Sequence, residues 1–308
     1  MPFEEIVGND KIKHLLVDAI NSNNILHSYM FIGEDGIGKR ILAKEFAKMI
    51  LCESTDNSNK PCEICKSCVE FYNDNNPDFI EIEPDGNSIK IDQIRDIQNK
   101  IIEKPIISNR KVYIINDSEK MTKEAQNCLL KTLEEPPEFI VIILITANEN
   151  LMLNTIKSRC TKINFSRLKN EDVIGLLKNK FNIEDVSKNI IEASEGSIGK
   201  ALQFEEKKEI YNSVDDILNN ISNIDLISLM NKAEIIYQSK NDILDILNYI
   251  NVILYKRMKE NYLDNKKYIN SIEIVEKTKS RLNSNSNYDM SIDFLLFKIW
   301  EELNKWKT

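Results

Sequence analysis

Several features that would place this chain in a membrane or outside the cell are missing from its sequence. No apolar run in its 308 residues approaches the length of about 18 residues that a membrane-spanning helix needs. The opening segment, MPFEEIVGNDKIK, carries charged side chains where the apolar centre of a secretion signal would lie. No internal repeat or long low-complexity tract stands out. We therefore expect no signal peptide and a cytoplasmic location.

An excess of positive charge is also missing. The chain has 41 Lys and Arg against 49 Asp and Glu, which gives a formal net charge of −8. Proteins that bind DNA over their whole surface usually carry a positive excess, so this composition excludes that class and leaves only a local basic strip open. The apolar share of 42% and the charged share of 29% are ordinary for a globular protein. The length is sufficient for two or three domains.

Histidine is scarce, and cysteine is concentrated in one place. His14 and His27 are the two histidines, and we expect ordinary packing or surface roles for both. Four of the six cysteines form the pattern Cys-x9-Cys-x2-Cys-x2-Cys between residues 52 and 68. This usage fits a reducing compartment better than a disulfide framework.

The cysteine pattern is typical of a metal site. Four thiolates with CxxC spacing suit a tetrahedral Zn²⁺ ion, and four protein ligands leave no open position for water, so the zinc would be structural. The segment ESTDNSNKP between them is too polar and too short to pack a core, which a metal would explain. A redox CxxC motif is the alternative. The predicted ligands are Cys52, Cys62, Cys65 and Cys68.

A glycine-rich loop, GEDGIGKR at 33–40, follows a short apolar strand pattern at 29–32 and precedes a helical pattern at 41–51. Strand, loop and helix in this order are the context of a phosphate-binding P-loop. Backbone N–H groups and the helix N-terminus would face the phosphates, and Lys39 would reach the outer ones. The glycines that would shape the loop are Gly33, Gly36 and Gly38.

The residue after Lys39 departs from the P-loop pattern. A Ser or Thr is expected there, because its hydroxyl holds Mg²⁺. The chain has Arg40 instead, and a guanidinium cannot bind a cation. Two interpretations stay open: the loop retains weak binding of ATP, ADP or phosphate, or it is purely structural.

Residues 111–160 contain the clearest fold signal. Two apolar runs, at 112–115 and 140–145, are rich in β-branched residues and unbroken, which is typical of parallel strands buried on both faces. Between them lies a helical pattern at 123–135, stopped by Pro136 and Pro137. The sequence therefore predicts a βαβ unit within a parallel α/β sheet.

Three segments of this stretch, NCLLKTLEEPP, LIT and TIKSRC, resemble the AAA+ subunits of bacterial clamp loaders, a family that includes the gamma/tau and delta prime subunits of DNA polymerase III. The resemblance is dense over residues 1–205 and thin beyond. It implies an α/β AAA+ module of the P-loop type at 1–165, with a small zinc module at about 52–68. A helical lid at 166–208 and an all-α C-terminal collar domain at 209–308 would follow.

Four sites depart from the ATP-hydrolysing pattern of that family. Besides Arg40, the pair Asn116-Asp117 stands where the family has Asp-Glu to assist Mg²⁺ and orient the attacking water. Ala147 stands at a polar sensor position, and Gly199, in GSIGKAL, replaces an arginine that contacts the outer phosphate. Each lost transition-state contact typically costs about two to three orders of magnitude in rate. Together they predict that the chain does not hydrolyse ATP by itself.

The motif Ser158-Arg159-Cys160 is intact. In the family it supplies an arginine finger in trans to a neighbour's nucleotide, which can raise the rate by about 10³–10⁵. A salt bridge within the chain is the alternative role. A degenerate site with a retained finger is similar to the delta prime type. It implies a stator-like member of a hetero-pentameric ring in the DNA polymerase III holoenzyme. The implied partners are the gamma/tau and delta subunits, the sliding clamp, and primer–template DNA through the assembly.

Two other hypotheses remain. The first is an ATP-hydrolysing clamp-loader motor of the gamma/tau type, which the intact GIGK segment favours. The second is a zinc-dependent nucleic-acid-binding module, which the acidic composition and the lack of a basic patch interleaved with aromatic residues disfavour.

Overall fold

The computed structural model describes residues 3, 6–57, 60–260, 265–284 and 286–304. The chain forms two compact units. The α/β unit comprises residues 1–172 and 196–198, and the helical unit comprises residues 173–195 and 199–308. The division into three domains at 165 and 208 stays a prediction. Residues 58 and 59 of the predicted zinc module lie outside the described residues.

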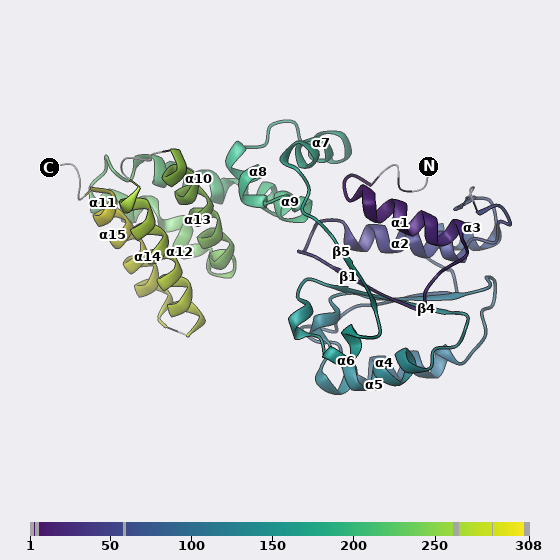
Figure 1. The fold of residues 1–308 in the computed structure, drawn as a ribbon. Helices are drawn as coiled ribbons and strands as arrows, with labels where there is room; N and C mark the ends of the chain where they lie inside the picture. Colours follow the sequence, from purple (N-terminus) through teal and green to yellow (C-terminus); the bar gives the residue numbers. More distant parts are fainter. Residues whose placement is uncertain (1–2, 4–5, 58–59, 261–264, 285, 305–308) are drawn as a thin grey trace. The chain divides into compact units, whose positions relative to one another are not determined.

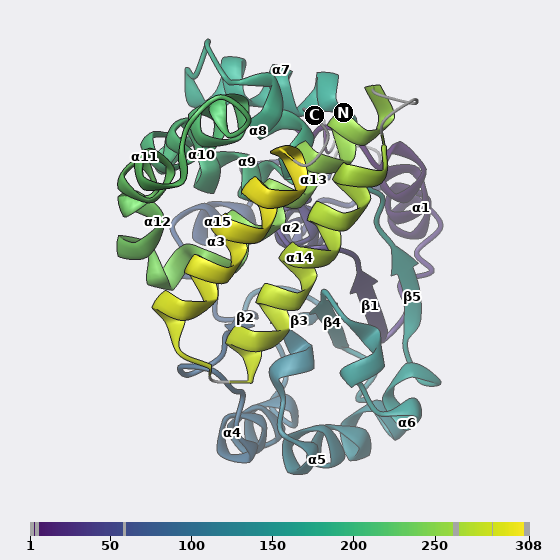
Figure 2. The same cartoon turned by 90° about the vertical axis from the view of Figure 1, so that its left-hand side faces the viewer.

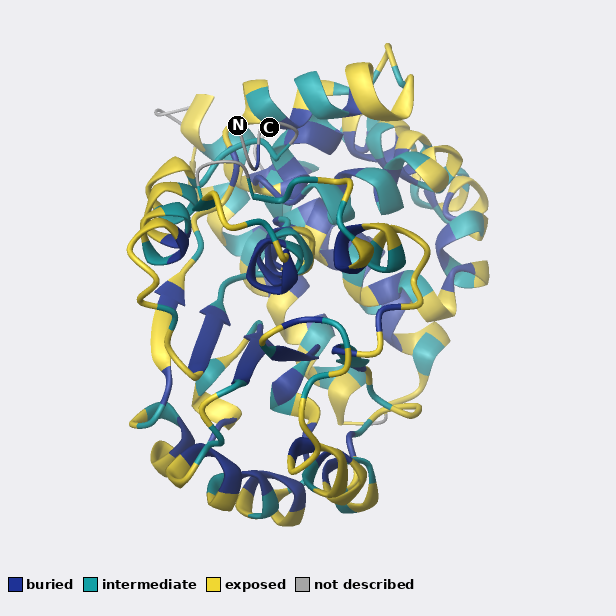
Figure 3. Ribbon diagram, turned by 90° about the vertical axis from the view of Figure 1, so that its right-hand side faces the viewer, coloured by how far each residue is buried: buried dark blue, intermediate teal, exposed yellow. Residues whose placement is uncertain are grey.

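A parallel sheet with the strand order β2-β3-β4-β1-β5 forms the centre of the α/β unit. Strands β3 and β4 are buried along their whole length, as Figure 3 shows, because helices cover both of their faces. The predicted βαβ unit and parallel sheet are confirmed. The strands are β1 (Ser28–Ile32), β2 (Phe79–Ile82), β3 (Lys111–Ile115), β4 (Ile140–Thr146) and β5 (Thr161–Asn164).

Helices lie on both faces of the sheet and give the α/β unit three layers (Figure 1). Helices α1 and α2 pack on one face around Phe31 and Phe46, and α4, α5 and α6 pack on the other around Tyr113 and Leu129. The Thr122 hydroxyl caps α5 by accepting the N–H of Ala125. The helices are α1 (Asp10–Asn21), α2 (Lys39–Leu51), α3 (Lys66–Tyr72), α4 (Ile91–Ile101), α5 (Lys123–Glu134) and α6 (Asn154–Lys157).

A buried carboxylate fixes the loop in front of β3. Asp78 is fully buried, and its two oxygens accept the backbone N–H groups of residues 106–108 at 2.7 to 2.8 Å. The Ser108 hydroxyl donates to the carbonyl of Leu51 at the end of α2 and lies 2.9 Å from the Ser67 hydroxyl of α3. Because each of these buried polar groups has a hydrogen-bond partner, the set ties the end of α2 and the cysteine segment to the sheet.

The described residues of the helical unit form helices only, as the sequence pattern predicts. Its core includes a cluster of three aromatic rings, Phe204, Tyr211 and Tyr249, with centroids 4.7 to 5.9 Å apart. Helix α14 packs against α13 and α15 (Figure 2). The helices are α7 (Asn170–Phe181), α8 (Lys188–Ser194), α9 (Ile198–Glu206), α10 (Lys208–Asn220), α11 (Leu226–Lys232), α12 (Glu234–Gln238), α13 (Ile243–Glu260), α14 (Lys266–Asn283) and α15 (Tyr288–Asn304).

Among the described residues, no helix combines the length and the apolar character needed to cross a bilayer.

Candidate functional site

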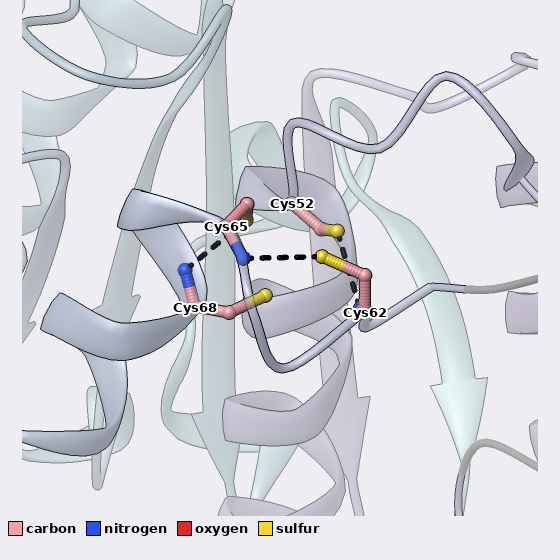
Figure 4. Close-up of side chains that lie close together, drawn as sticks. All are labelled: Cys52, Cys62, Cys65 and Cys68. Atoms are coloured by element: carbon pink, nitrogen blue, oxygen red, sulfur yellow. Dashed lines mark hydrogen bonds between the residues drawn. The ribbon is translucent and has the colours of Figure 1, made fainter.

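The four predicted zinc ligands converge on one point (Figure 4). Their sulfur atoms all lie within 4.8 Å of one another. A tetrahedral zinc ion with Zn–S bonds of about 2.3 Å would hold its sulfurs about 3.8 Å apart, so a small contraction is sufficient to bind it. Cys52 directly follows α2, Cys62 and Cys65 lie in the following loop, and Cys68 lies in the first turn of α3.

Backbone N–H groups point at the cysteine sulfurs. The N–H groups of Cys62, Cys65 and Cys68 donate to the sulfurs of Cys52, Cys62 and Cys65, each at 3.4 Å. Burial acts to raise the pKa of Cys62, but the N–H groups of Ile64 and Cys65 outweigh it and lower that pKa to about 7. Burial raises the pKa of Cys52 and of Cys68. Four converging sulfurs with these donors are better explained by a site for a thiolate-binding metal than by a redox pair of cysteines.

The loop between β1 and α2 has a backbone conformation at two of its glycines that other residues rarely adopt. Gly36 and Gly38 have φ values of 74° and 94°, which an L side chain rarely adopts. A Cβ added at Gly33 would lie 2.7 Å from the side chain of Ile37 and 3.0 Å from that of Phe165. A side chain at Gly33 would therefore press on Ile37 and Phe165, which gives this glycine a packing role as well as any role at a phosphate.

Lys39 is turned into its own loop. Its side chain is 5% exposed, and its ammonium donates to the carbonyls of Gly33 at 2.5 Å and Glu34 at 2.6 Å. It also lies 3.7 Å from a carboxylate oxygen of Asp35. Burial lowers the pKa of Lys39, and the Asp35 and Glu119 carboxylates oppose that effect. The positive charge predicted to bind phosphate is thus satisfied within the chain.

The sequence predicts that Arg40 and Asn116 lie at a degenerate magnesium site. In the structure both side chains contact the same carboxylate, which belongs to Glu81. Arg40 Nε lies 2.7 Å from Glu81 Oε1, and Asn116 Nδ2 donates to the same oxygen at 2.5 Å. Lys44 Nζ lies 2.8 Å from Glu81 Oε2, and Arg40 also pairs with Glu83. We call Arg40, Lys44, Glu81 and Asn116 the Glu81 clasp.

Charge stabilises the Glu81 clasp. Burial acts to raise the pKa of Glu81, which is 15% exposed, but hydrogen bonds from Arg40, Lys44 and Asn116 lower it below its ordinary value. The hydrogen bond to Glu81 raises the pKa of Arg40. Mg²⁺ requires oxygen ligands in near-octahedral geometry. Positions 40 and 116 direct N–H donors at the Glu81 carboxylate, so the residues present do not fit a magnesium ion.

Three other positions bear on the prediction that the chain does not hydrolyse ATP: Asp117, Ala147 and Gly199. The Asp117 carboxylate pairs with Lys120 at 2.8 Å, and both side chains are over 40% exposed. The Ala147 N–H donates to Glu119 Oε1 at 3.1 Å. Gly199 lies on α9, in the helical unit. The structure therefore places Asn116 and Arg40 on the same carboxylate, whereas Asp117 forms a separate ion pair at the surface.

Arg159 lies at the surface of the α/β unit. Its guanidinium lies 2.9 Å from Glu134 Oε1 at the end of α5 and donates to the carbonyl of Thr155 at 3.0 Å. Its own carbonyl accepts the Ser28 hydroxyl at 2.6 Å, which fixes the backbone. The Arg159 side chain is 35% exposed. Exposed ion pairs contribute about 0–1 kcal/mol to the free energy of unfolding, so this weak pair leaves the guanidinium able to exchange Glu134 for an anion that binds it more tightly.

Sequence analysis missed three residues of these sites: Glu81, Lys44 and Glu134. A signal for Glu81 exists, because FIEIE places Glu81 and Glu83 on one face of an otherwise apolar strand, where they need cationic partners. Lys44 lies one helical turn after Arg40 and therefore on the same face of α2. Nothing in the sequence links Glu134 to Arg159.

Comparison with known proteins gives consistent results. Residues 8–169 match the family model described as "DNA polymerase III, delta subunit". The chain is similar to DNA polymerase III subunit tau of Bacillus subtilis, 36% identical over 208 residues that make up 66% of this chain and 37% of that protein. It is also similar to DNA polymerase III subunit delta' of Bacillus subtilis, 37% identical over 158 residues, or 51% of this chain and 47% of that protein.

The chain spans less than half the length of either Bacillus relative. Among solved structures, it is similar to a DNA polymerase III gamma subunit-related protein of Thermotoga maritima, with 20% identity and a TM-score of 0.48. That match covers 96% of this chain and 99% of the other.

Proposed function

Because this chain belongs to the DNA polymerase III delta-subunit family of clamp-loader proteins, and is related to the gamma and tau subunits, we propose that it is a clamp-loader subunit that does not hydrolyse ATP itself. It acts as a stator-like member of the ring and supplies Arg159 to the ATP site of a neighbouring ATPase subunit. Its partners are the gamma/tau and delta subunits, the sliding clamp and, through the assembly, primer–template DNA.

The observation that carries this proposal is the Glu81 clasp. ATP hydrolysis by a P-loop protein needs Mg²⁺ on the phosphates and a group that orients the attacking water. In this chain a carboxylate lies between the two positions that would bind the metal. Lys39 donates to its own loop, and Asp117 pairs with Lys120. Of the two interpretations of the P-loop, these contacts favour the structural one.

Arg159 supports the second half of the proposal. Its backbone is fixed by Ser28, and its guanidinium is partly exposed beside Glu134. An arginine with a fixed backbone and a weak partner is suited to bind an anion from outside its own subunit, because little has to be broken to release it. The converging cysteines are proposed to hold structural zinc, which would order the segment that follows α2.

The test measures ATP turnover in two stages. The purified, zinc-loaded chain with Mg²⁺, DNA and the sliding clamp is expected to show no turnover. Mixing it with the ATPase subunit is then expected to restore loader ATPase, and Arg159→Ala is expected to lower the rate at the one ATP site that Arg159 serves by about 10³-fold. Arg95→Ala is a matched control, because Arg95 is an exposed arginine of the same unit that pairs with Asp92. Robust turnover by the chain alone would refute the proposal.

The alternative is an ATP-hydrolysing motor of the gamma/tau type. The similarity to tau, which extends over 208 residues, favours it, as does the complete GIGK segment. In that case the chain alone would turn over ATP, and Lys39→Met would abolish that turnover. The first stage of the same experiment therefore separates the two functions.

A further inference from the structure

The contacts around Glu81 have the polarity opposite to that of a metal site. A magnesium site at these positions would place a hydroxyl at 40 and a carboxylate at 116 around a cation. The chain places a guanidinium at Arg40 and an amide N–H at Asn116 around the carboxylate of Glu81. Hydrogen-bond donors therefore stand where the ligands of a metal would stand. The group at the centre is an anion, the Glu81 carboxylate, instead of a cation.

The charges of the Glu81 clasp and the neighbouring Glu83 cancel. Arg40 and Lys44 contribute two positive charges, and Glu81 and Glu83, both paired with Arg40, contribute two negative charges. Both oxygens of Glu81 accept from these donors. Within the part of the chain that the structure describes, the Oδ1 atom of Asn116 is buried without a hydrogen-bond partner, and one such oxygen is too few to bind Mg²⁺ against its hydration shell. The group therefore offers a divalent cation no ligand set.

The same contacts join three elements. Arg40 and Lys44 lie one turn apart at the start of α2, Glu81 lies on β2, and Asn116 directly follows β3. Glu81 is mostly buried and Asn116 is 6% exposed, so their hydrogen bonds are shielded from water. In a nucleotide-binding P-loop protein, a Mg²⁺ ion held by the P-loop hydroxyl and a strand carboxylate links the corresponding loop and strand.

We propose that the Glu81 clasp is a charge-inverted replacement for a metal site, which fastens the start of α2 to β2 and β3 without a divalent cation and keeps such a cation out. The proposal concerns the chain itself and stands whether or not the chain acts in a clamp loader. It therefore fails or succeeds separately from the role of Arg159.

The first experiment measures Mn²⁺ binding to the zinc-loaded full chain by the loss of the free-ion signal in electron paramagnetic resonance. Mn²⁺ stands in for Mg²⁺, and no chelator is used, because it would remove zinc. The wild-type chain and the control variant Arg95→Ser, which both keep the clasp, are expected to show no saturable Mn²⁺ binding. The double variant Arg40→Ser with Asn116→Asp restores a hydroxyl and a carboxylate and releases Glu81. It is expected to bind Mn²⁺ about tenfold more tightly than the wild type, or better.

Two results would overturn the proposal. One is saturable Mn²⁺ binding by the wild type that Asn116→Ala abolishes. The other is a folded double variant, judged by circular dichroism, that gains no affinity.

A second measurement keeps the proposal testable if the double variant does not fold. In Glu81→Gln the anion at the centre is removed without creating a metal site. Hydrogen exchange of the α2 amides at residues 42–46 is expected to become about tenfold faster, while exchange in α5, which lies on the other face of the sheet, stays unchanged. Glu83→Gln is the matched control, because Glu83 is the more exposed carboxylate and, among the described residues, forms its ion pair with Arg40 alone. Equal exchange in the wild type and Glu81→Gln would overturn the proposal.

Discussion

The cysteine cluster and the Glu81 clasp lie at opposite ends of the same helix. Cys52 directly follows the last residue of α2, and Arg40 is the second residue of its first turn. Both places have the residue spacing of a cation site. At the cysteine end four sulfurs converge within 4.8 Å. At the other end two N–H donors converge on a carboxylate.

The difference shows what spacing can and cannot predict. Spacing is set by the backbone, and a backbone can be retained for packing after its ligand is lost. Gly33 illustrates this, because a side chain there would press on Ile37 and Phe165 whether or not a phosphate is bound. Whether a site binds a cation depends on the side chains that reach its centre, and one of these, Glu81, comes from a different strand.

The largest expected effect is at the cysteine end. Cys68→Ser removes a buried ligand, so we expect loss of bound zinc, measured by elemental analysis, and a lower Tm. Structural zinc contributes about 10–16 kcal/mol in isolated zinc-finger peptides, so a loss of several kcal/mol is expected here. Cys128→Ser is the matched control, because Cys128 lies outside the cluster. An unchanged zinc content in Cys68→Ser would contradict the assignment.

A smaller effect is expected at the clasp, and it depends on pH. Because the folded-state pKa of Glu81 lies below its ordinary value of 4.5, its ionised form stabilises the fold. That contribution is complete above a pH of about 4.5 and is lost as the pH falls through the folded-state value. Urea unfolding should show Glu81→Gln to be about 2 kcal/mol less stable than the wild type at neutral pH. The difference in stability between the two proteins should shrink in acid. A difference that persists at low pH would contradict the conclusion that ionised Glu81 stabilises the fold.

The smallest effect is expected at Lys39. In a nucleotide site its removal would abolish ATPase activity, but here its ammonium donates to Gly33 and Glu34 of its own loop. Lys39→Met should leave the ATPase of the reconstituted loader unchanged and lower the stability of the free chain by about 1 kcal/mol. A large loss of loader ATPase, with the chain still folded, would show that the P-loop of this chain binds nucleotide after all.

Much of the fold could be predicted because its signals are local. The unbroken β-branched runs of β3 and β4 and the two prolines after α5 fix a βαβ unit within 50 residues of sequence. The cysteine cluster was also predictable, since its ligands span only residues 52–68.

The clasp could not be predicted, because its members are far apart in sequence. Arg40 and Glu81 are 41 positions apart, and Glu81 and Asn116 are 35 apart. Sequence analysis identified the loss of a ligand at 40 and at 116, but not the carboxylate that now joins them. The Arg159–Glu134 pair has the same character, because it depends on how the end of α5 packs beside the segment before β5.

Helix α2 is held at both ends. Its first turn bonds to Glu81, and the carbonyl of its last residue, Leu51, accepts the Ser108 hydroxyl from the loop that Asp78 fixes. A helix that drives motion must tilt or slide as its ligand changes, and α2 could do so only by breaking ion pairs at its start or the buried Ser108 hydrogen bond at its end. Helix α2 is therefore fixed in place, and we expect the α/β unit to move as one rigid body, with little bending between its P-loop and its cysteine cluster.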